Sequence, residues 1–139
     1  MSSVHYGDVS VDDELPPLPI PLTASLIVAG AIASRDYQDV HHDPTLAREK
    51  GSPDIFMNIL TTNGLIGRYV TDWAGPDAVV KKVAIRLGAP NYPGDTMTIT
   101  GKVTRKEDGA NGGIVDVAVV GANRLGNHVT GTVTVELPS

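Results

Sequence analysis

Residues 52–76 read SPDIFMNILTTNGLIGRYVTDWAGP, and this stretch decides the fold. Apolar side chains recur in it at the spacing of one helix face, between a Ser-Pro-Asp start signal and a Gly-Pro end signal. The apolar stripe is broad, which is typical of a largely buried helix. A small, polar patch at residues 61–64 leaves room for another backbone or a ligand. The apolar positions are Ile55, Phe56, Ile59, Leu60, Ile66, Tyr69, Val70 and Trp73.

After this helix the apolar period changes to two, which is the period of strands. Turn-forming residues separate four such runs and predict an antiparallel meander. The short apolar run at residues 23–29 adds one strand before the helix. A long buried helix with one antiparallel sheet is an α+β domain, which we place at residues 22–139. The four runs are residues 82–87, 97–104, 114–120 and 129–136.

Residues 1–21 are expected to form a loosely structured, proline-rich arm. Prolines at positions 16, 17, 19 and 21 exclude a helix or a central strand and favour extended polyproline geometry. The apolar residues among them indicate that the arm lies against a surface rather than free in solvent.

Composition narrows the classes of partner. The chain has 139 residues, 41% of them hydrophobic, which is enough for one domain with its own core. A net charge of −5 without a long basic run argues against nucleic acid and anionic membranes as partners. The lack of cysteine excludes disulfides and thiolate metal sites. We expect a cytoplasmic protein, because no run is long enough to span a membrane and the N-terminus lacks the order of a signal peptide.

The chemistry centres on residues 34–43, which read SRDYQDVHHD. Asp36 and His41 could together activate a water and deliver a proton. Spacing alone favours a plainer interpretation, a polar loop in which Asp36 caps a turn and His41 is solvated. Such pairs arise often by chance in a chain with 16 acidic residues and four histidines. A metal at His41, His42 and Asp43 is not expected, since adjacent side chains seldom reach one ion together.

Several separated pieces of the chain resemble the MaoC-like, R-specific enoyl-CoA hydratases. Residues 34–43 fall in register on the motif of that family at its serine, its two acids and its histidine, although Arg35 replaces a usual glycine. Gly51 falls on the glycine before the central helix and Gly64 on a small residue within it. Residues 87–95, LGAPNYPGD, look like the strand and loop that end in Pro-Gly-Asp in that family.

This resemblance implies a hot-dog fold, in which an antiparallel sheet wraps around the long helix. It implies that Asp36 and His41 are the catalytic dyad. Gln38, which stands where the family has asparagine, is implied to position the water or the acid. Ile59 replaces a glycine whose N–H holds the thioester oxygen, and Gly51 lies in the same candidate region. The implied chemistry needs no metal, nucleotide or flavin, and coenzyme A enters as part of the substrate.

A narrower resemblance, at residues 35–43, 54–60 and 70–76, is to the small subunit of actinobacterial heteromeric hydratases of steroid side-chain degradation. It implies an enoyl-CoA substrate with a steroid at its acyl end. It also implies a second, different MaoC-like subunit without the dyad, in a heterodimer or heterotetramer. A homodimeric hydratase of fatty enoyl-CoA and a non-catalytic hot-dog partner are the alternatives.

Lys82 and Arg86 are the candidates for contact with the phosphates of coenzyme A. They lie on the same face of a predicted strand, and each carries a positive charge. A solvated outer strand face is the more common role for such residues.

Overall fold

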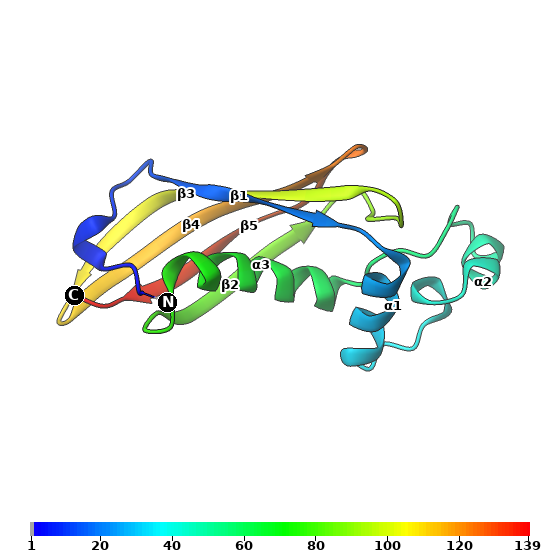
Figure 1. Ribbon diagram of the computed structural model, residues 1–139, viewed down its shortest axis with the longest axis horizontal. Coiled ribbons are helices and arrows are strands. Elements are labelled where there is room, and N and C mark those ends of the chain that lie inside the picture. The colour runs from blue at the N-terminus through cyan, green and yellow to red at the C-terminus, as the bar shows by residue number, and fades with distance from the viewer. Residues whose placement is uncertain (1) are drawn as a thin grey trace.

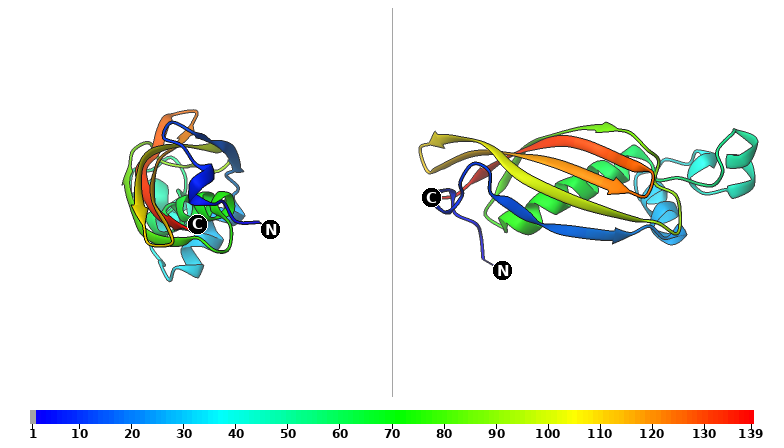
Figure 2. Two further views of the ribbon diagram at one scale, coloured as in Figure 1. Left: turned by 90° about the vertical axis from the view of Figure 1, so that its left-hand side faces the viewer. Right: turned by 90° about the horizontal axis from the view of Figure 1, so that it is seen from above.

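A five-stranded antiparallel sheet curves around the helix α3 in the computed structural model, which describes residues 2–139 (Figure 1). The strand order is β1-β3-β4-β5-β2, so the predicted four-strand meander is wrong for its first strand: β3, β4 and β5 follow one another, but β2 pairs with β5 at the far edge. Views from the end and from above show the sheet wrapped around α3, with α1 and α2 at the end of the molecule opposite the two termini (Figure 2). The α+β class predicted from the sequence is confirmed. The strands are β1 (Glu14–Pro21), β2 (Val79–Leu87), β3 (Thr96–Gly109), β4 (Gly112–Asn123) and β5 (Gly126–Leu137), and the helices are α1 (Ala24–Ala33), α2 (Pro44–Glu49) and α3 (Ile59–Ala74), with short 3-10 turns η1 (Tyr6–Asp8) and η2 (Asp39–His41).

The core lies between α3 and the inner face of the sheet. Ile66 and Val70, one helical turn apart on α3, have no exposed surface. Val103, Val117 and Val133 lie opposite one another on three neighbouring strands and are also fully buried. Burying one such side chain contributes about 1.5–3 kcal/mol. The alternation of apolar and polar residues in the sequence therefore predicts correctly which face of these strands packs on the helix.

A close approach between β3 and α3 depends on Gly101. A Cβ atom at this position would lie 2.9 Å from Cε2 of Tyr69 and 3.2 Å from Cγ1 of Val117. The Tyr69 hydroxyl donates a hydrogen bond to the carbonyl of Pro16 at 2.9 Å, and burial raises the pKa of Tyr69, so the proton is retained. β1 bulges at residues 15–18, where the prolines are tolerated because this strand is at the sheet edge.

Replacing Gly101 with alanine is therefore expected to lower the free energy of unfolding by about 1–3 kcal/mol, the usual cost of overpacking. Gly64→Ala is the matched control. A Cβ atom at Gly64, within α3, meets nothing within 4 Å. This control should raise stability by up to about 1 kcal/mol through helix propensity. Urea unfolding of both variants measures the difference, and equal stabilities would mean that Tyr69 moves aside at no cost.

Residues 23–29 form most of α1, so the strand predicted there is wrong. Thr23 is the N-cap of this helix, and its hydroxyl oxygen accepts a hydrogen bond from the N–H of Leu26 at 3.0 Å. A short continuous apolar run has the same pattern in a buried strand and in a buried helix. The capping threonine was the local signal for a helix.

The long helix begins at Ile59, several residues later than its sequence pattern predicts. Residues 52–57 reach it without helical structure, and the N–H groups of Phe56 and Met57 donate to carbonyls of η2 and of the loop before β3. The short helix predicted after Asp43 is confirmed as α2, with Asp43 as its N-cap. Among residues 2–139 there is no helix long and apolar enough to cross a membrane.

The N-terminal segment is more ordered than the loose arm expected from its sequence. Its second half is β1, which pairs with β3, in agreement with the exclusion of a helix or central strand. In its first half, the Val4 and Tyr6 N–H groups each donate to carbonyls of the folded domain at 2.8 Å. The Tyr6 hydroxyl donates to Asp108 at 2.7 Å. Composition does not reveal such partners. The domain boundary at residue 22 stays a prediction.

Candidate active site

A tight turn after α1 carries Asp36 toward the start of α3. Arg35 has a φ of 56°, in the left-handed region, and the N–H of Asp36 donates to the carbonyl of Ala31 at 2.9 Å. This conformation costs a non-glycine residue roughly 1–2 kcal/mol, whereas glycine adopts it freely. This left-handed backbone explains why the MaoC-like motif has a glycine at this position. Arg35 adopts the same conformation, so the turn is preserved in this chain.

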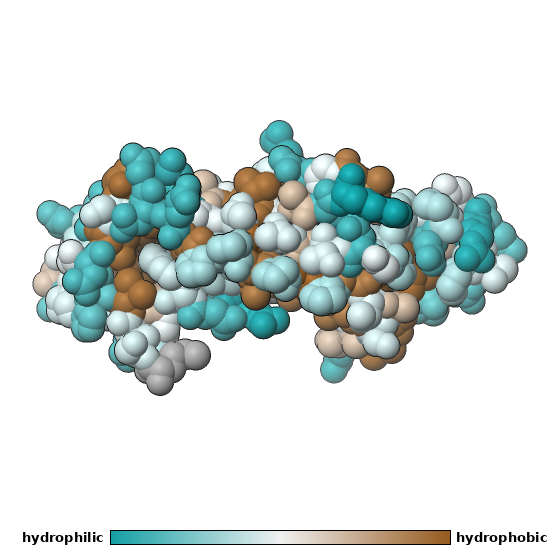
Figure 3. All heavy atoms as spheres, turned by 45° about the horizontal axis from the view of Figure 1, so that its top comes forward, coloured by the Kyte–Doolittle hydropathy of each residue, from teal (hydrophilic) through white to brown (hydrophobic). Residues whose placement is uncertain are grey.

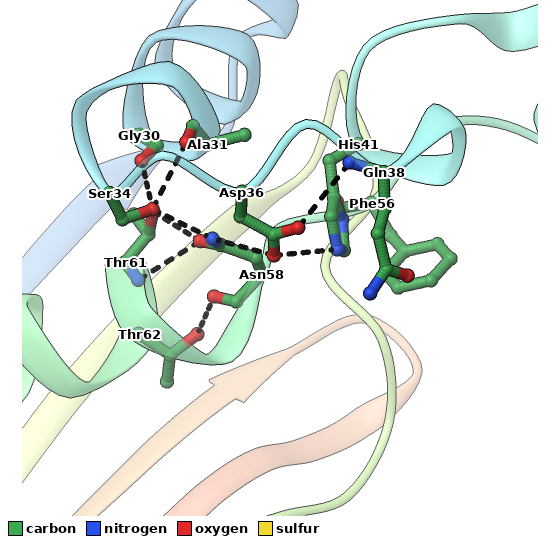
Figure 4. A network of polar contacts seen from close by, with 10 residues as sticks. All are labelled: Gly30, Ala31, Ser34, Asp36, Gln38, His41, Phe56, Asn58, Thr61 and Thr62. Atoms are coloured by element: carbon green, nitrogen blue, oxygen red, sulfur yellow. Dashed lines mark hydrogen bonds and ion pairs between the residues drawn. The ribbon is translucent and has the colours of Figure 1, made fainter.

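The side chains of Asp36 and His41 face each other (Figure 4), with Oδ2 and Nε2 3.3 Å apart. The other ring nitrogen of His41, Nδ1, lies 2.7 Å from the carbonyl oxygen of Phe56. Because a carbonyl only accepts, Nδ1 carries a proton and neutral His41 has its lone pair on Nε2. The ring of Phe56 packs edge-on against the imidazole at 5.0 Å between centroids. Nε2 is therefore the nitrogen that can exchange protons beside Asp36.

Asp36 lies among groups that favour its charge. The amide of Asn58 donates to Oδ2 at 3.1 Å, and the backbone N–H of Gln38 donates to Oδ1 at 3.4 Å. These two hydrogen bonds, that of Asn58 above all, hold the pKa of Asp36 below its usual value, against the opposing effect of burial. The stabilisation from ionised Asp36 is present above its unfolded pKa of about 3.9 and is lost as pH falls through the lower folded-state pKa. Asp36 is thus a carboxylate at neutral pH.

A cavity of about 360 Å³ opens beside this pair. Ile59 and Leu60, in the first turn of α3, have backbone N–H groups without a hydrogen-bond acceptor anywhere in residues 2–139. Such amides at a helix N-terminus favour a developing negative charge. The cavity thus combines a carboxylate, an imidazole lone pair and a free N–H donor. Its lining residues are Asp36, Gln38, His41, Phe56, Met57, Asn58, Ile59, Leu87, Gly88, Pro90 and His128.

The structure brings four of the seven predicted site residues together and leaves three apart, Gly51, Lys82 and Arg86. Asp36, Gln38, His41 and Ile59 line the same cavity, whereas Gly51 does not. The N–H of Gly51 is already bonded to a carbonyl of α2 at 3.0 Å, and its φ of 93° marks a helix end. Because α3 begins at Ile59, Gly51 is not at the start of the central helix. The structure therefore gives no support to Gly51 as a thioester donor.

Lys82 and Arg86 lie on β2 with exposed side chains, and neither lines the cavity. The next residues of the chain, Leu87 and Gly88, do form part of its wall. Burial raises the pKa of Asp116, but its hydrogen bonds lower it by more, so that the pKa is below its usual value. Nearby Lys82 makes a smaller contribution in the lowering direction. Contact of the two basic residues with coenzyme A stays a prediction.

The residue that the sequence reasoning missed is His128, which lines the cavity from β5. It is 2% exposed; its Nδ1 lies 2.7 Å from the carbonyl of Ala89 and its Nε2 lies 2.8 Å from the Thr62 hydroxyl. Burial lowers the pKa of His128, so the ring is neutral at physiological pH. In a regular strand, neighbouring side chains point to opposite faces, so the His128 side chain would point outward because that of Val129 is buried. A register shift in the β4–β5 pairing, which the sequence pattern does not reveal, turns it inward.

The wrapped helix and the acid–imidazole cavity define the class of protein. The sequence model of the family described as MaoC like domain matches residues 9–124, and the chain belongs to this family. The chain is also 51% identical over 123 residues to the 3-oxo-4,17-pregnadiene-20-carboxyl-CoA hydratase beta subunit of Mycobacterium tuberculosis (strain ATCC 25618 / H37Rv). That match covers 88% of this chain and 92% of the relative.

Solved structures agree with this family. A chain of the ChsH1-ChsH2 complex from Mycobacterium tuberculosis superimposes with a TM-score of 0.87 at 50% identity, covering 92% of this chain and 98% of that one. R-hydratase PhaJ1 from Pseudomonas aeruginosa gives a TM-score of 0.88 at 19% identity over 99% of this chain and 87% of that chain. The (R)-hydratase from A. caviae gives 0.83 at 20% identity, over 94% and 98%. The predicted hot-dog fold is confirmed.

Proposed function

We propose that this chain hydrates a trans-2-enoyl-CoA to a 3-hydroxyacyl-CoA with Asp36 and His41. The observation that carries the proposal is the geometry of the pair: a carboxylate and an imidazole lone pair 3.3 Å apart, on the wall of a cavity that also contains an unpaired helix N–H. Water addition to an enoyl thioester needs these three elements, namely a base, a proton donor and a donor to the thioester oxygen.

In the proposed reaction, a water in the cavity contacts Oδ1 of Asp36 and Nε2 of His41. Nε2 removes one proton as the water oxygen bonds to C3, and the electrons of the double bond move toward the thioester carbonyl. The imidazolium that forms has an Nε2–H pointing at the Asp36 carboxylate, which stabilises it. The pair then returns one proton to C2 and its resting state is restored. Water is the only co-reactant, and no metal or redox cofactor is required.

The developing negative charge on the thioester oxygen is proposed to be stabilised by the Ile59 N–H. This N–H is at the first position of α3, where the partial positive charge of the helix end adds to the hydrogen bond. Ile59 is 52% exposed and lines the cavity, and its N–H is proposed to face the cavity side. Gln38 is proposed to help place the water, since it lines the same cavity.

We further propose that the acyl group is a steroid side chain and that a second MaoC-like hot-dog subunit completes the enzyme. The support is the 51% identity to the beta subunit named above and the match to a chain of the solved ChsH1-ChsH2 complex. Three apolar residues of α1 and of the start of α3, Ile32, Ile59 and Leu60, also have more than half of their surface exposed, as expected of a contact surface for a partner. Figure 3 shows apolar atoms at the surface over α1, where Ile32 lies.

The purified chain alone is expected to be weakly active or inactive, and its partner is expected to restore hydration of a steroid-sized enoyl-CoA. The physical reason is that the outer edge of β2 has no strand partner within residues 2–139 and the cavity is open to solvent on one side. Molar mass by light scattering and hydration rate, each measured with and without the partner, check this prediction.

Two outcomes would favour the alternatives. Full activity of the chain alone on short linear enoyl-CoA would indicate a homodimeric fatty enoyl-CoA hydratase. No hydration by any complex that contains the intact pair would indicate a non-catalytic subunit. If the proposal holds, each heterodimer has one working site, and Asp36→Asn in this chain alone removes the activity of the whole complex.

A further inference from the structure

Asn58 has a buried side chain in which both the oxygen and the nitrogen of the amide form hydrogen bonds. It is 2% exposed and caps α3. Its Oδ1 accepts hydrogen bonds from the N–H of Thr61 at 3.0 Å and from the Thr61 hydroxyl at 2.6 Å. Its Nδ2 donates to the Ser34 hydroxyl at 2.9 Å and to Oδ2 of Asp36 at 3.1 Å. Because Oδ1 faces two donors, the amide has one satisfactory orientation, and that orientation presents Nδ2 to Asp36.

This contact makes the two oxygens of Asp36 different. Oδ2 is occupied by Asn58 and lies 3.3 Å from Nε2 of His41. Oδ1 has one long contact, the 3.4 Å bond from the N–H of Gln38. Oδ1 therefore keeps free lone-pair directions and is the oxygen available to a water in the cavity.

We propose that Asn58 is a positioning residue for the hydration reaction, which aligns Asp36 with the oxyanion donors at the start of α3. The proposal rests on the function proposed above. Asp36 and the proposed oxyanion donor come from separate segments of chain, the turn after α1 and the first turn of α3 (Figure 4). Asn58 is covalently next to Ile59 and hydrogen-bonded to Asp36, so one side chain sets the separation between them. A displacement of about 1 Å between reacting groups can cost two orders of magnitude in rate.

The hydrogen bond from Asn58 also affects the charge of Asp36. The Asn58 amide is the largest cause of the lowered pKa of Asp36. The titratable groups around Asp36 are His41 on η2 and, elsewhere on the cavity wall, His128 on β5, while the first turn of α3 has no acidic side chain. Loss of the amide should therefore raise the pKa of Asp36 and move the acidic limb of the rate profile to higher pH.

Two substitutions separate positioning from helix capping. Asn58→Ser keeps an N-cap oxygen, but its side chain is too short to reach Asp36. Asn58→Asp also keeps the cap, replaces the donor with an acceptor and adds a second negative charge beside Asp36. The control is Thr23→Ala, which removes the N-cap of α1 at a residue that does not line the cavity.

The experiment uses the assembled complex with enoyl-CoA, together with NMR titration of the Asp36 carboxyl in the folded chain. We expect kcat to fall at least ~10-fold in Asn58→Ser and further in Asn58→Asp, with KM changed less, and the Asp36 titration to move to higher pH in both. Thr23→Ala should lower the melting temperature but keep kcat and the titration unchanged.

A folded Asn58→Ser complex with the kcat, pH profile and carboxyl titration of the native protein would overturn the inference. An equal loss of kcat in Thr23→Ala would also overturn it, because the loss in the Asn58 variants would then be explained by lower helix stability alone. Failure of the native complex to hydrate enoyl-CoA would instead overturn the proposed function, and the carboxyl titration would still report whether Asn58 controls Asp36.

Discussion

Replacing His41 with alanine is expected to lower kcat for enoyl-CoA hydration by ~10²–10⁴-fold, the usual contribution of a positioned acid–base group. Asp36→Asn should have an effect of similar size, because a neutral amide cannot stabilise the imidazolium that forms at His41. Steady-state rates of the assembled complex measure both losses. The double variant should be little worse than either single one, since the two side chains act as a unit.

Neighbouring residues provide controls of the same type. His42→Ala removes an exposed imidazole next to His41, and Asp39→Asn removes a carboxylate that pairs with Lys50 at 3.3 Å. Neither His42 nor Asp39 lines the cavity, so both controls should keep near-native rates. Near-native turnover in well-folded His41→Ala and Asp36→Asn proteins would contradict the mechanism.

Replacing Ile59 with proline is expected to lower kcat by ~10²–10³-fold, the usual cost of losing one oxyanion donor. Proline removes the N–H, and it is well tolerated at the first position of a helix. The preceding Asn58 has φ −79° and ψ 160°, which is the extended conformation that a residue before proline prefers. The substitution should therefore delete the donor and leave α3 in place. Stopped-flow or steady-state hydration rates measure the loss.

Ile59→Gly is the matched control, because it removes the side chain and keeps the N–H. It should retain most of the activity and lose up to about 1 kcal/mol of stability. Circular dichroism establishes that both variants keep their helix content. If Ile59→Pro were folded and as active as Ile59→Gly, the thioester oxygen would have to bind another donor.

The strands and the buried helix could be predicted because their apolar periods are distinct. The alternation in β3, β4 and β5 and the stripe on α3 follow from burial on one face, which local sequence records directly. The run at residues 23–29 could not be assigned in this way, since it is apolar on every side. Its N-capping threonine carried the deciding information and outweighed the strand-like composition.

The site was predictable to the extent that it follows a local motif. Asp36, Gln38 and His41 lie within six residues, and a resemblance to a family was enough to predict them as a site; the structure places them around one cavity, and their roles stay predictions. The long helix was predicted to start too early, close to Gly51, because its start depends on the Asn58 cap rather than on the first apolar residue of the stripe. His128 was missed because its inward direction results from a register shift between β4 and β5. Long-range pairing of this kind has no local signal.

The measurement that tests the central claim most directly compares two complexes on the same enoyl-CoA. One contains the native chain with its partner, and the other contains the chain with Asp36→Asn and His41→Ala together. Mass spectrometry of the product and loss of the enoyl-thioester absorbance follow the reaction. We expect that only the native complex adds one water to the substrate. Hydration at the native rate by the doubly substituted complex, with both complexes intact by light scattering, would contradict it.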